Sequence, residues 1–296
     1  MIAFSMAHST PPSPEVAVVT VSYGSDSVLP AFLGSVQFAS ARPLQVVVAD
    51  NRDGSGDSSV ERIAGSFGAD YLPLGANLGY GAAVNAAVAA LPRSVGWVLI
   101  SNPDVVMHRG ALDRLLESAM ANQRIAAVGP AIYTGLGVLY PSAREIPSLG
   151  TGVGHALFAN VWTANPWTRS YRGVESNSRR NAGWLSGACL LVQRSAFEEV
   201  GGFDPNFFMY FEDVDLGYRF GRAGYYNLYE PAASVTHTGA HSTSSDAESM
   251  VRVHHLSAIR FLGKRYPGRL RWPVRAALSL SLSVRSTLIR RSARER

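Results

Sequence analysis

Three carboxylates lie within four positions of the sequence, at Glu212, Asp213 and Asp215. Like charges held this close raise one another's pKa, which suits a general base that removes a proton near neutral pH. The aromatic run from Phe207 to Phe211 precedes them and would suit a wall that binds a sugar ring. The alternative is a solvated, acidic start to a helix, where carboxylates interact favourably with the helix dipole.

Asp104 ends the segment Ser101-Asn102-Pro103-Asp104 and is a candidate metal ligand. Mg²⁺ and Mn²⁺ prefer oxygen ligands and typically bind few carboxylates together with substrate phosphates. Such a cation would stabilise the negative charge that develops on a leaving diphosphate. The alternative is a proline turn with a capping aspartate.

His237 follows a candidate strand from Ala233 to Thr236 and could add an imidazole to the same cation. A lone histidine is more often structural. His241 lies four residues later, but no cysteine or glutamate pattern of a zinc protease accompanies the pair, which argues against zinc.

Asp50 directly follows the apolar run from Val46 to Ala49. A carboxylate at the end of a strand can accept a hydrogen bond from the imide N–H of a uracil or thymine base. Asp50 could instead cap a helix or form a turn. No Walker A pattern is present, which excludes the simplest kind of ATPase.

The elements that must position these side chains are predicted by the first half of the chain, where apolar runs alternate with helical patterns. Such alternation indicates βαβ units and a mainly parallel sheet. The expected strands are 16–22, 44–49, 71–74 and 97–101, and the expected helices are 28–39, 58–67, 81–90 and 111–121. Ligands of such sheets bind at the carboxyl ends of the strands. The polar residues expected there are Ser22, Tyr23, Asp50, Asn51, Asn77, Asn102 and Asp104.

The second half of the chain is less regular. The segment from Pro141 to Arg180 is rich in Gly, Pro, Trp and Asn and is expected to form loops over the sheet. The apolar run from Trp184 to Val192 contains the single cysteine, Cys189, so an intrachain disulfide is impossible and a buried thiol is expected. This cysteine usage fits a reducing cytoplasm.

Length and composition indicate one main domain, expected at residues 15–265, because 296 residues with 47% hydrophobic side chains can bury a large core. Residues 1–14 lack a basic start followed by an apolar run and contain three prolines, so a disordered tail is expected rather than a signal peptide. No apolar run approaches the roughly 18 residues that span a bilayer.

Basic charge is concentrated in the last part of the chain. Ten arginine and lysine residues lie between Lys264 and Arg296, against Glu295 alone. Apolar residues alternate with these arginines, so residues 266–296 are expected to form an amphipathic extension on an anionic membrane surface. The alternative is a solubilising or disordered tail. Nucleic acid is not an expected partner, because no aromatic platform accompanies the charge.

The segments 19–23, 50–51, 77–79, 102–104 and 212–216, in this order, resemble those of family 2 inverting glycosyltransferases of the GT-A fold. The resemblance covers about residues 15 to 265. More narrowly, the segments 75–81, 140–144, 165–168 and 183–187 resemble the actinobacterial rhamnosyltransferases of cell-wall linker (arabinogalactan–peptidoglycan) biosynthesis. Those enzymes move L-rhamnose from dTDP-L-rhamnose to the 3-hydroxyl of N-acetylglucosamine on a polyprenyl diphosphate.

The resemblance implies an α/β, Rossmann-like GT-A fold with a mainly parallel central sheet flanked by helices, a basic C-terminal helical extension, and Mg²⁺ or Mn²⁺ as cofactor. It implies Asp213 as the base, with Glu212 beside it, and Asp104 and His237 as metal ligands. The implied donor-binding residues are Ser22, Tyr23, Asp50, Asn51, Asn77, Gly79, Asn102 and Asp104, and the implied acceptor-binding residues are Trp184, Ser186, Gly187 and Asp215. Asn102-Pro103-Asp104 stands where the family usually has Asp-x-Asp.

The expected enzyme is therefore an inverting rhamnosyltransferase of the cytoplasm, peripheral on the inner face of the plasma membrane. Two alternatives remain at this point. One is a transferase of the same fold for another sugar, such as galactofuranose or mannose. The other is a non-catalytic protein that binds nucleotide sugars.

Overall fold

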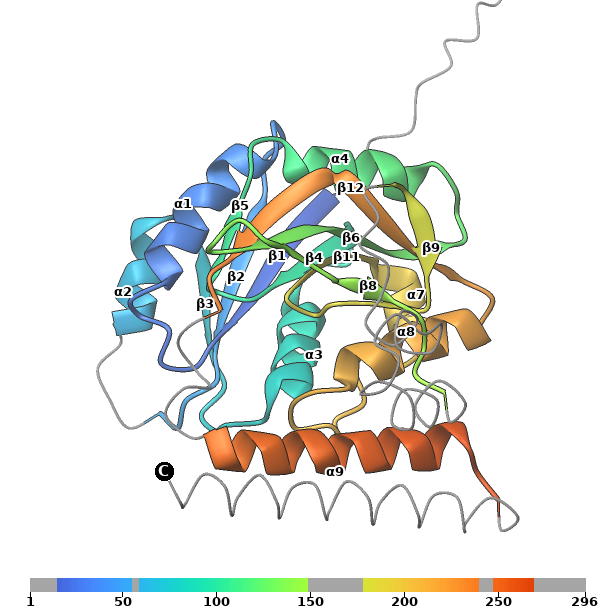
Figure 1. Ribbon diagram of the computed structural model, residues 1–296. Coiled ribbons are helices and arrows are strands. Elements are labelled where there is room, and N and C mark those ends of the chain that lie inside the picture. The colour runs from blue at the N-terminus through green and yellow to red at the C-terminus, as the bar shows by residue number, and fades with distance from the viewer. Residues whose placement is uncertain (1–14, 55–58, 149–177, 240–246, 269–296) are drawn as a thin grey trace, which may run out of the picture.

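A computed structural model describes residues 15–54, 59–148, 178–239 and 247–268 (Figure 1). The expected tail at 1–14, the segment 165–168 and nearly all of the expected extension at 266–296 lie outside the described residues.

The first half of the chain forms the expected alternation of strands and helices. The strands are β1 (Glu15–Ser22), β2 (Gln45–Asp50), β3 (Asp70–Pro73) and β4 (Val95–Ser101), and the helices are α1 (Leu29–Ala39), α2 (Ser59–Ser66), α3 (Tyr80–Ala90) and α4 (Ala111–Met120). Strands β3, β2, β1 and β4 lie side by side in that order and pair in parallel. Their carboxyl ends therefore meet at one edge of the sheet.

The sheet continues beyond β4 as a mixed half. It adds β11 (Cys189–Gln193), β6 (Ile125–Thr134), β12 (Tyr226–His237) and β5 (Val105–Met107), with β7 (Leu139–Tyr140) paired to β6 and β9 (Arg180–Ala182) paired to β12. Strand β11 is antiparallel to both β4 and β6, whereas β12 is parallel to β6. The expected mainly parallel sheet is thus a parallel half joined through β11 to a mixed half.

Both faces of the sheet are covered by helices (Figure 1). Helices α1, α2 and α4 pack on one face, and α3, α7 (Arg194–Glu199) and α8 (Glu212–Arg222) pack on the other. Neighbouring strand residues divide between the two cores, as Val18 and Val19 do. Because both faces are buried, the strands are continuous apolar runs in the sequence.

A long helix, α9 (Ala247–Arg265), lies at the bottom of the molecule in Figure 1, below α8. Its Phe261 is fully buried against Phe207 and Val214. The ammonium of Lys264 lies 2.7 Å from a carboxylate oxygen of Asp215 on α8. Helix α9 is therefore fixed to the helix that begins with the acidic cluster. In the part of the chain that the structure describes, no helix has the length and apolar character needed to cross a membrane.

A second, two-stranded sheet forms within a region expected to be loops. Strand β8 (Ala143–Arg144) pairs antiparallel with β10 (Trp184–Leu185), with Arg144 opposite Trp184. The backbone N–H of Ser186 donates to the carbonyl of Ser142 at 2.8 Å and extends the connection. This ribbon leads directly into the Ser186–Gly187 turn of the site described next.

Candidate active site

The acidic cluster occupies the first turn of α8, directly after two residues with unusual backbone. Tyr210 and Phe211 both have φ of 66°, a left-handed conformation that costs a non-glycine residue about 1 kcal/mol or more. The ring of His254 on α9 packs against both of them, at 5.4 and 5.3 Å between ring centroids. Such backbone is typical of functional sites, where the surrounding structure enforces it.

Asp213 accepts two backbone hydrogen bonds that favour the charged form of its carboxylate. Its Oδ2 accepts a hydrogen bond from the Gly187 N–H at 2.9 Å, and its Oδ1 accepts one from the Val214 N–H at 2.8 Å. Burial raises the pKa of Asp213, and these two hydrogen bonds oppose the shift without cancelling it. A partly desolvated carboxylate of raised pKa is suited to accept a proton.

Glu212 is buried beside Asp213, and its Oε2 has no hydrogen-bond partner among the described residues. Burial, and then the charge of Asp213, raise the pKa of Glu212 to about 8. The two groups titrate as a pair. Because Asp213 receives two backbone N–H bonds, the pair holds one proton near neutral pH, on Glu212, and one charge, on Asp213.

Asp104 and His237 come together from distant parts of the chain. His237 Nε2 lies 3.0 Å from Asp104 Oδ1 and 3.4 Å from Asn102 Nδ2. Burial acts to raise the pKa of Asp104, but the hydrogen bond and charge of His237 hold it below its ordinary value. Asp104 is therefore ionised at neutral pH.

This pair fits a divalent cation. Two ligand atoms 3.0 Å apart match neighbouring positions around an octahedral ion with bonds of about 2.1 Å. Among the residues that the structure describes, no group of three or more His, Cys, Asp or Glu side chains could hold a metal. Two protein ligands suit Mg²⁺ or Mn²⁺, which typically complete their coordination with substrate phosphates and water.

The Gly187–Ala188 turn connects the Glu212–Asp213 pair to the Asp104–His237 pair. The Gly187 N–H binds Asp213, and the next carbonyl, that of Ala188, accepts the Asn102 N–H at 2.9 Å. Asn102 in turn precedes Asp104 and contacts His237. Asp213 and the Asp104–His237 pair thus share one edge of the sheet.

Asp50, the last residue of β2, lies at the opposite end of the site from Asp213. Asp50 accepts hydrogen bonds from Arg52 Nε at 3.2 Å and from the Tyr71 hydroxyl at 3.2 Å. Strands β2 and β4 are separated by β1 alone, so Asp50 and the start of the β4 loop are about 10 Å apart. This spacing fits a nucleotide whose base lies near Asp50 and whose phosphates lie near Asp104.

Asn51 and Asn77 hold the loops that flank this edge. Asn51 Nδ2 donates to Asn77 Oδ1 at 3.0 Å, and its Oδ1 accepts the Leu78 N–H at 2.9 Å. Because both amide atoms of the buried Asn51 are used, its role in the structure is to position the loop before α3. The exposed Tyr23 lies at the end of β1, on the rim of the same edge.

Three expected contact residues have no side-chain surface to offer. Asp215 was expected near the acceptor, but it is 0% exposed and is paired with Arg219 and Lys264. Ser22 was expected near the donor, but it is 0% exposed in the sheet. Gly79 lies against the backbone, because a Cβ there would be 2.4 Å from the Phe208 carbonyl oxygen. These expectations are corrected. Asp215, Ser22 and Gly79 are buried beneath the site and support it through packing.

Trp184, Ser186 and Gly187 lie where an acceptor was expected. Trp184 Nε1 donates to the Glu145 carbonyl at 3.2 Å, which fixes the indole ring. Ser186 and Gly187 form the turn that contacts Asp213. All three are therefore close to the base.

Sequence reasoning missed four residues of the site, which are Arg52, Tyr71, Tyr80 and Arg144. The Tyr80 hydroxyl donates to the Gly187 carbonyl at 2.8 Å, so it supports the same turn as Asp213. Arg52 lies two residues after Asp50, and this spacing was a visible signal. Tyr71 and Arg144 become site residues only through strand pairing, which no local pattern reveals.

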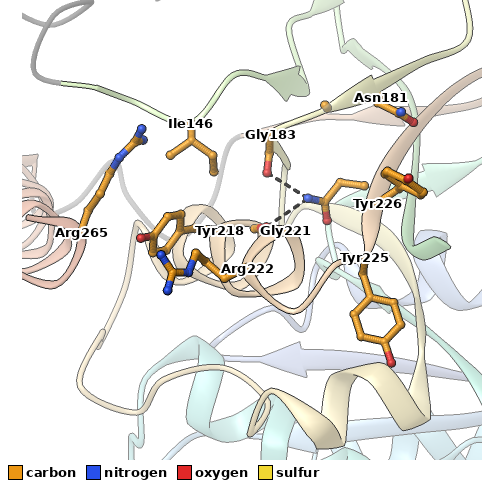
Figure 2. Close-up of a pocket in the computed structure, with 12 residues that line it drawn as sticks. Ile146, Asn181, Gly183, Tyr218, Gly221, Arg222, Tyr225, Tyr226 and Arg265 are labelled. Carbon is orange, nitrogen blue, oxygen red and sulfur yellow. Dashed lines mark hydrogen bonds between the residues drawn. The ribbon is translucent and has the colours of Figure 1, made fainter. Parts of the chain in front are cut away.

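A pocket of about 290 Å³ lies beside the site rather than within it (Figure 2). Asn227 donates hydrogen bonds to the carbonyls of Gly183 and Gly217 in its wall, and Tyr218, Arg222 and Arg265 also line it. None of the expected site residues is in the lining. Gly183 and Gly217 of the lining lie next to Trp184, but Asp213, Asp104 and His237 lie outside the lining.

Comparisons with known proteins bear on this arrangement. The family described as "Glycosyltransferase like family 2" matches residues 12–254. The N-acetylglucosaminyl-diphospho-decaprenol L-rhamnosyltransferase of Mycobacterium tuberculosis is 45% identical over 291 residues, which cover 94% of each chain.

Two solved structures share the fold. The mannosyltransferase PcManGT from Pyrobaculum calidifontis, in complex with GDP-Man and Mn²⁺, superposes with a TM-score of 0.57 and 16% identity, covering 95% of this chain and 76% of that one. GalNAc-T7 with UDP, GalNAc and Mn²⁺ superposes with a TM-score of 0.55 and 15% identity, covering 91% of this chain and 55% of that one. The expected α/β GT-A fold is confirmed.

Proposed function

The chain belongs to glycosyltransferase-like family 2, and on that basis we propose that it transfers L-rhamnose from dTDP-L-rhamnose, with inversion, to the 3-hydroxyl of N-acetylglucosamine on a polyprenyl diphosphate. The identity of 45% with the mycobacterial rhamnosyltransferase supports the sugar and the lipid-linked acceptor. The observation that carries the chemistry is the Asp213 carboxylate, held by Gly187 beside the Asp104–His237 pair.

Asp213 removes the proton of the acceptor hydroxyl as that oxygen attacks the anomeric carbon. The bond to the leaving diphosphate breaks on the opposite face of the sugar, so the anomeric configuration inverts. The raised pKa of Asp213 makes it a better proton acceptor than an exposed aspartate. Glu212 keeps the one proton that the pair holds, which leaves Asp213 ionised for this step.

Asp104 and His237 would hold a divalent cation against the donor phosphates. When bound, Mg²⁺ or Mn²⁺ supplies positive charge that stabilises the leaving diphosphate. Asn102 orients His237 from the side. The Mn²⁺ complexes of the two structural neighbours support this assignment.

Asp50 would bind the thymine base through its imide N–H. In the structure its carboxylate is held in place by hydrogen bonds from Arg52 and Tyr71. Base binding requires Arg52 to give up part of this contact or to stack on the base. We assign the remaining donor contacts to Tyr23, Asn77 and Asn102.

The experiment that tests the function is a screen of nucleotide sugars against N-acetylglucosaminyl-diphospho-polyprenol of short chain length. Transfer from dTDP-L-rhamnose, to the 3-hydroxyl and with inverted configuration by NMR, is the expected result. Faster transfer from a galactofuranose or mannose donor would assign the chain to another sugar. Donor binding without transfer to any acceptor would identify a binding protein instead.

We further propose that the enzyme is cytoplasmic and peripheral on the inner face of the plasma membrane. The lipid-linked substrate of the mycobacterial relative and the basic residues after Lys264 support this location. Each basic residue near an anionic surface is worth about 1 kcal/mol. Truncation after Tyr266 should release the protein from anionic vesicles without loss of transfer to a soluble acceptor. Retained vesicle binding would reject the role of the extension.

A further inference from the structure

Arg144 lies beside Asp213. The proposed reaction assigns no role to its guanidinium. Its guanidinium carbon lies 5.3 Å from the ring centroid of Tyr140 and 5.6 Å from that of Trp184. Its Nε donates to the Pro141 carbonyl at 2.7 Å. Within the described part of the chain, no carboxylate forms an ion pair with it. The guanidinium is therefore held in place by two rings and one carbonyl.

The ribbon that carries Arg144 is connected to Asp213. Arg144 pairs with Trp184 across the β8–β10 ribbon, and that strand continues into Gly187, which binds Asp213. Arg180 Nη2 donates to the Ala143 carbonyl at 2.7 Å and fixes β8 from the other side. Arg144 is also close enough to lower the pKa of Asp213, against the larger effect of burial. The Arg144 guanidinium and the Asp213 carboxylate thus lie on one rigid surface.

A guanidinium that is held by aromatic rings and forms no ion pair with a described carboxylate is suited to bind phosphate. Its planar N–H groups match two phosphate oxygens, and aromatic rings on either side reduce the entropy that binding must overcome. The donor diphosphate would be bound by the divalent cation that Asp104 and His237 hold, on the other side of the Gly187–Ala188 turn. A second diphosphate, that of the acceptor, has no cation assigned to it.

We propose that Arg144 binds the diphosphate of the acceptor. This inference rests on the proposed function, in which the acceptor is a sugar joined through its C1 oxygen to a diphosphate. The attacking hydroxyl and the C1 oxygen belong to the same sugar ring. A group that binds the phosphate must then lie close to the base, and Arg144 pairs with Trp184, three residues before Gly187, which binds Asp213. Tyr140 and Trp184 flank this position and form the wall for the ring.

The test compares two acceptors of different charge. One is N-acetylglucosaminyl-diphospho-polyprenol of short chain length, and the other is octyl β-N-acetylglucosaminide, which carries no phosphate. Arg144→Gln should raise KM for the diphosphate acceptor by about 10- to 100-fold, the usual effect of losing a hydrogen bond to a charged group. Its kcat should change little, and its kcat/KM for the neutral acceptor should stay near that of the unmodified enzyme. Arg144→Lys should restore part of the preference.

The matched control is Arg114→Gln, which removes a positive charge from α4 on the opposite face of the sheet. It should leave both acceptors unaffected. An equal loss of kcat/KM on both acceptors would show that Arg144 does not act through the acceptor diphosphate and would overturn the inference. Absence of transfer by the unmodified enzyme to either acceptor would instead refute the proposed function.

Discussion

Replacement of Glu212 by glutamine should change how stability depends on pH. Burial and the charge of Asp213 raise the pKa of Glu212 from 4.5 to about 8. The folded protein therefore binds this proton more tightly than the unfolded chain does. The stabilisation is fully present below about pH 4.5 and is lost as the pH rises through 8. One pKa unit corresponds to about 1.4 kcal/mol, so the full effect reaches about 5 kcal/mol.

Glu212 and Asp213 share one proton, so only part of this stabilisation belongs to Glu212 alone. We expect the measured loss of stability with rising pH to be at least about 2 kcal/mol. Glutamine has the shape of the protonated acid and does not titrate. The free energy of unfolding of the Glu212→Gln variant, relative to the unmodified protein, should therefore rise between pH 5 and pH 8. Transfer activity at pH 7 should persist, because glutamine resembles the state that Glu212 adopts there.

Urea unfolding at pH 5.0, 6.5 and 8.0 measures the difference. The matched control is Glu117→Gln, since Glu117 is exposed on α4 and the same chemical change there should give parallel curves. If the curves of Glu212→Gln and the unmodified protein are also parallel, the burial of an uncharged Glu212 beside Asp213 is wrong. The proton assignment of the pair would then be reversed or absent.

Two further predictions concern the metal-ligating pair and the support of α8. Asp104→Ala should lower transfer by about 100-fold or more and should abolish Mn²⁺ binding in the presence of dTDP, measured by electron paramagnetic resonance; full activity in excess chelator would exclude the cation. Lys264→Met should reduce the free energy of unfolding by about 1–3 kcal/mol, because it leaves the buried Asp215 with Arg219 alone while Lys264 itself is partly exposed. Lys264→Arg should retain most of that stability, and a Lys264→Met protein as stable as the unmodified one would show that the pair contributes nothing.

The elements of the first half could be predicted because their signals are local. Strands β1, β2 and β4 each contain a continuous apolar run that ends in a polar residue, and each helix between the strands has its own period. The insertion of β11 between β4 and β6 could not be predicted, because nothing near Cys189 specifies its partners. Strand β12 was expected only from Ala233 to Thr236, but it runs from Tyr226 to His237, and the structure accommodates Pro231 where the register shifts after Glu230.

The candidate site was predictable where chemistry follows directly from a strand end, as at Asp50 and Asp104. The pairing of His237 with Asp104 was implied by the resemblance, and the 3.0 Å separation agrees with it. Asp215 was misassigned because a cluster of acidic residues does not show which members face inward. Arg219 lies four residues later and was a visible partner, but Lys264 is joined to Asp215 only by the packing of α9.

The most direct test of the account is the Asp213→Asn variant, which keeps the size of the side chain and removes its ability to accept a proton at neutral pH. Single-turnover transfer should fall by about 100- to 10,000-fold, the range of a lost general base, while calorimetry should show unchanged binding of dTDP-L-rhamnose with Mn²⁺. Transfer at the rate of the unmodified enzyme, or a loss of transfer that is matched by a loss of donor binding, would contradict the assignment of Asp213 as the base.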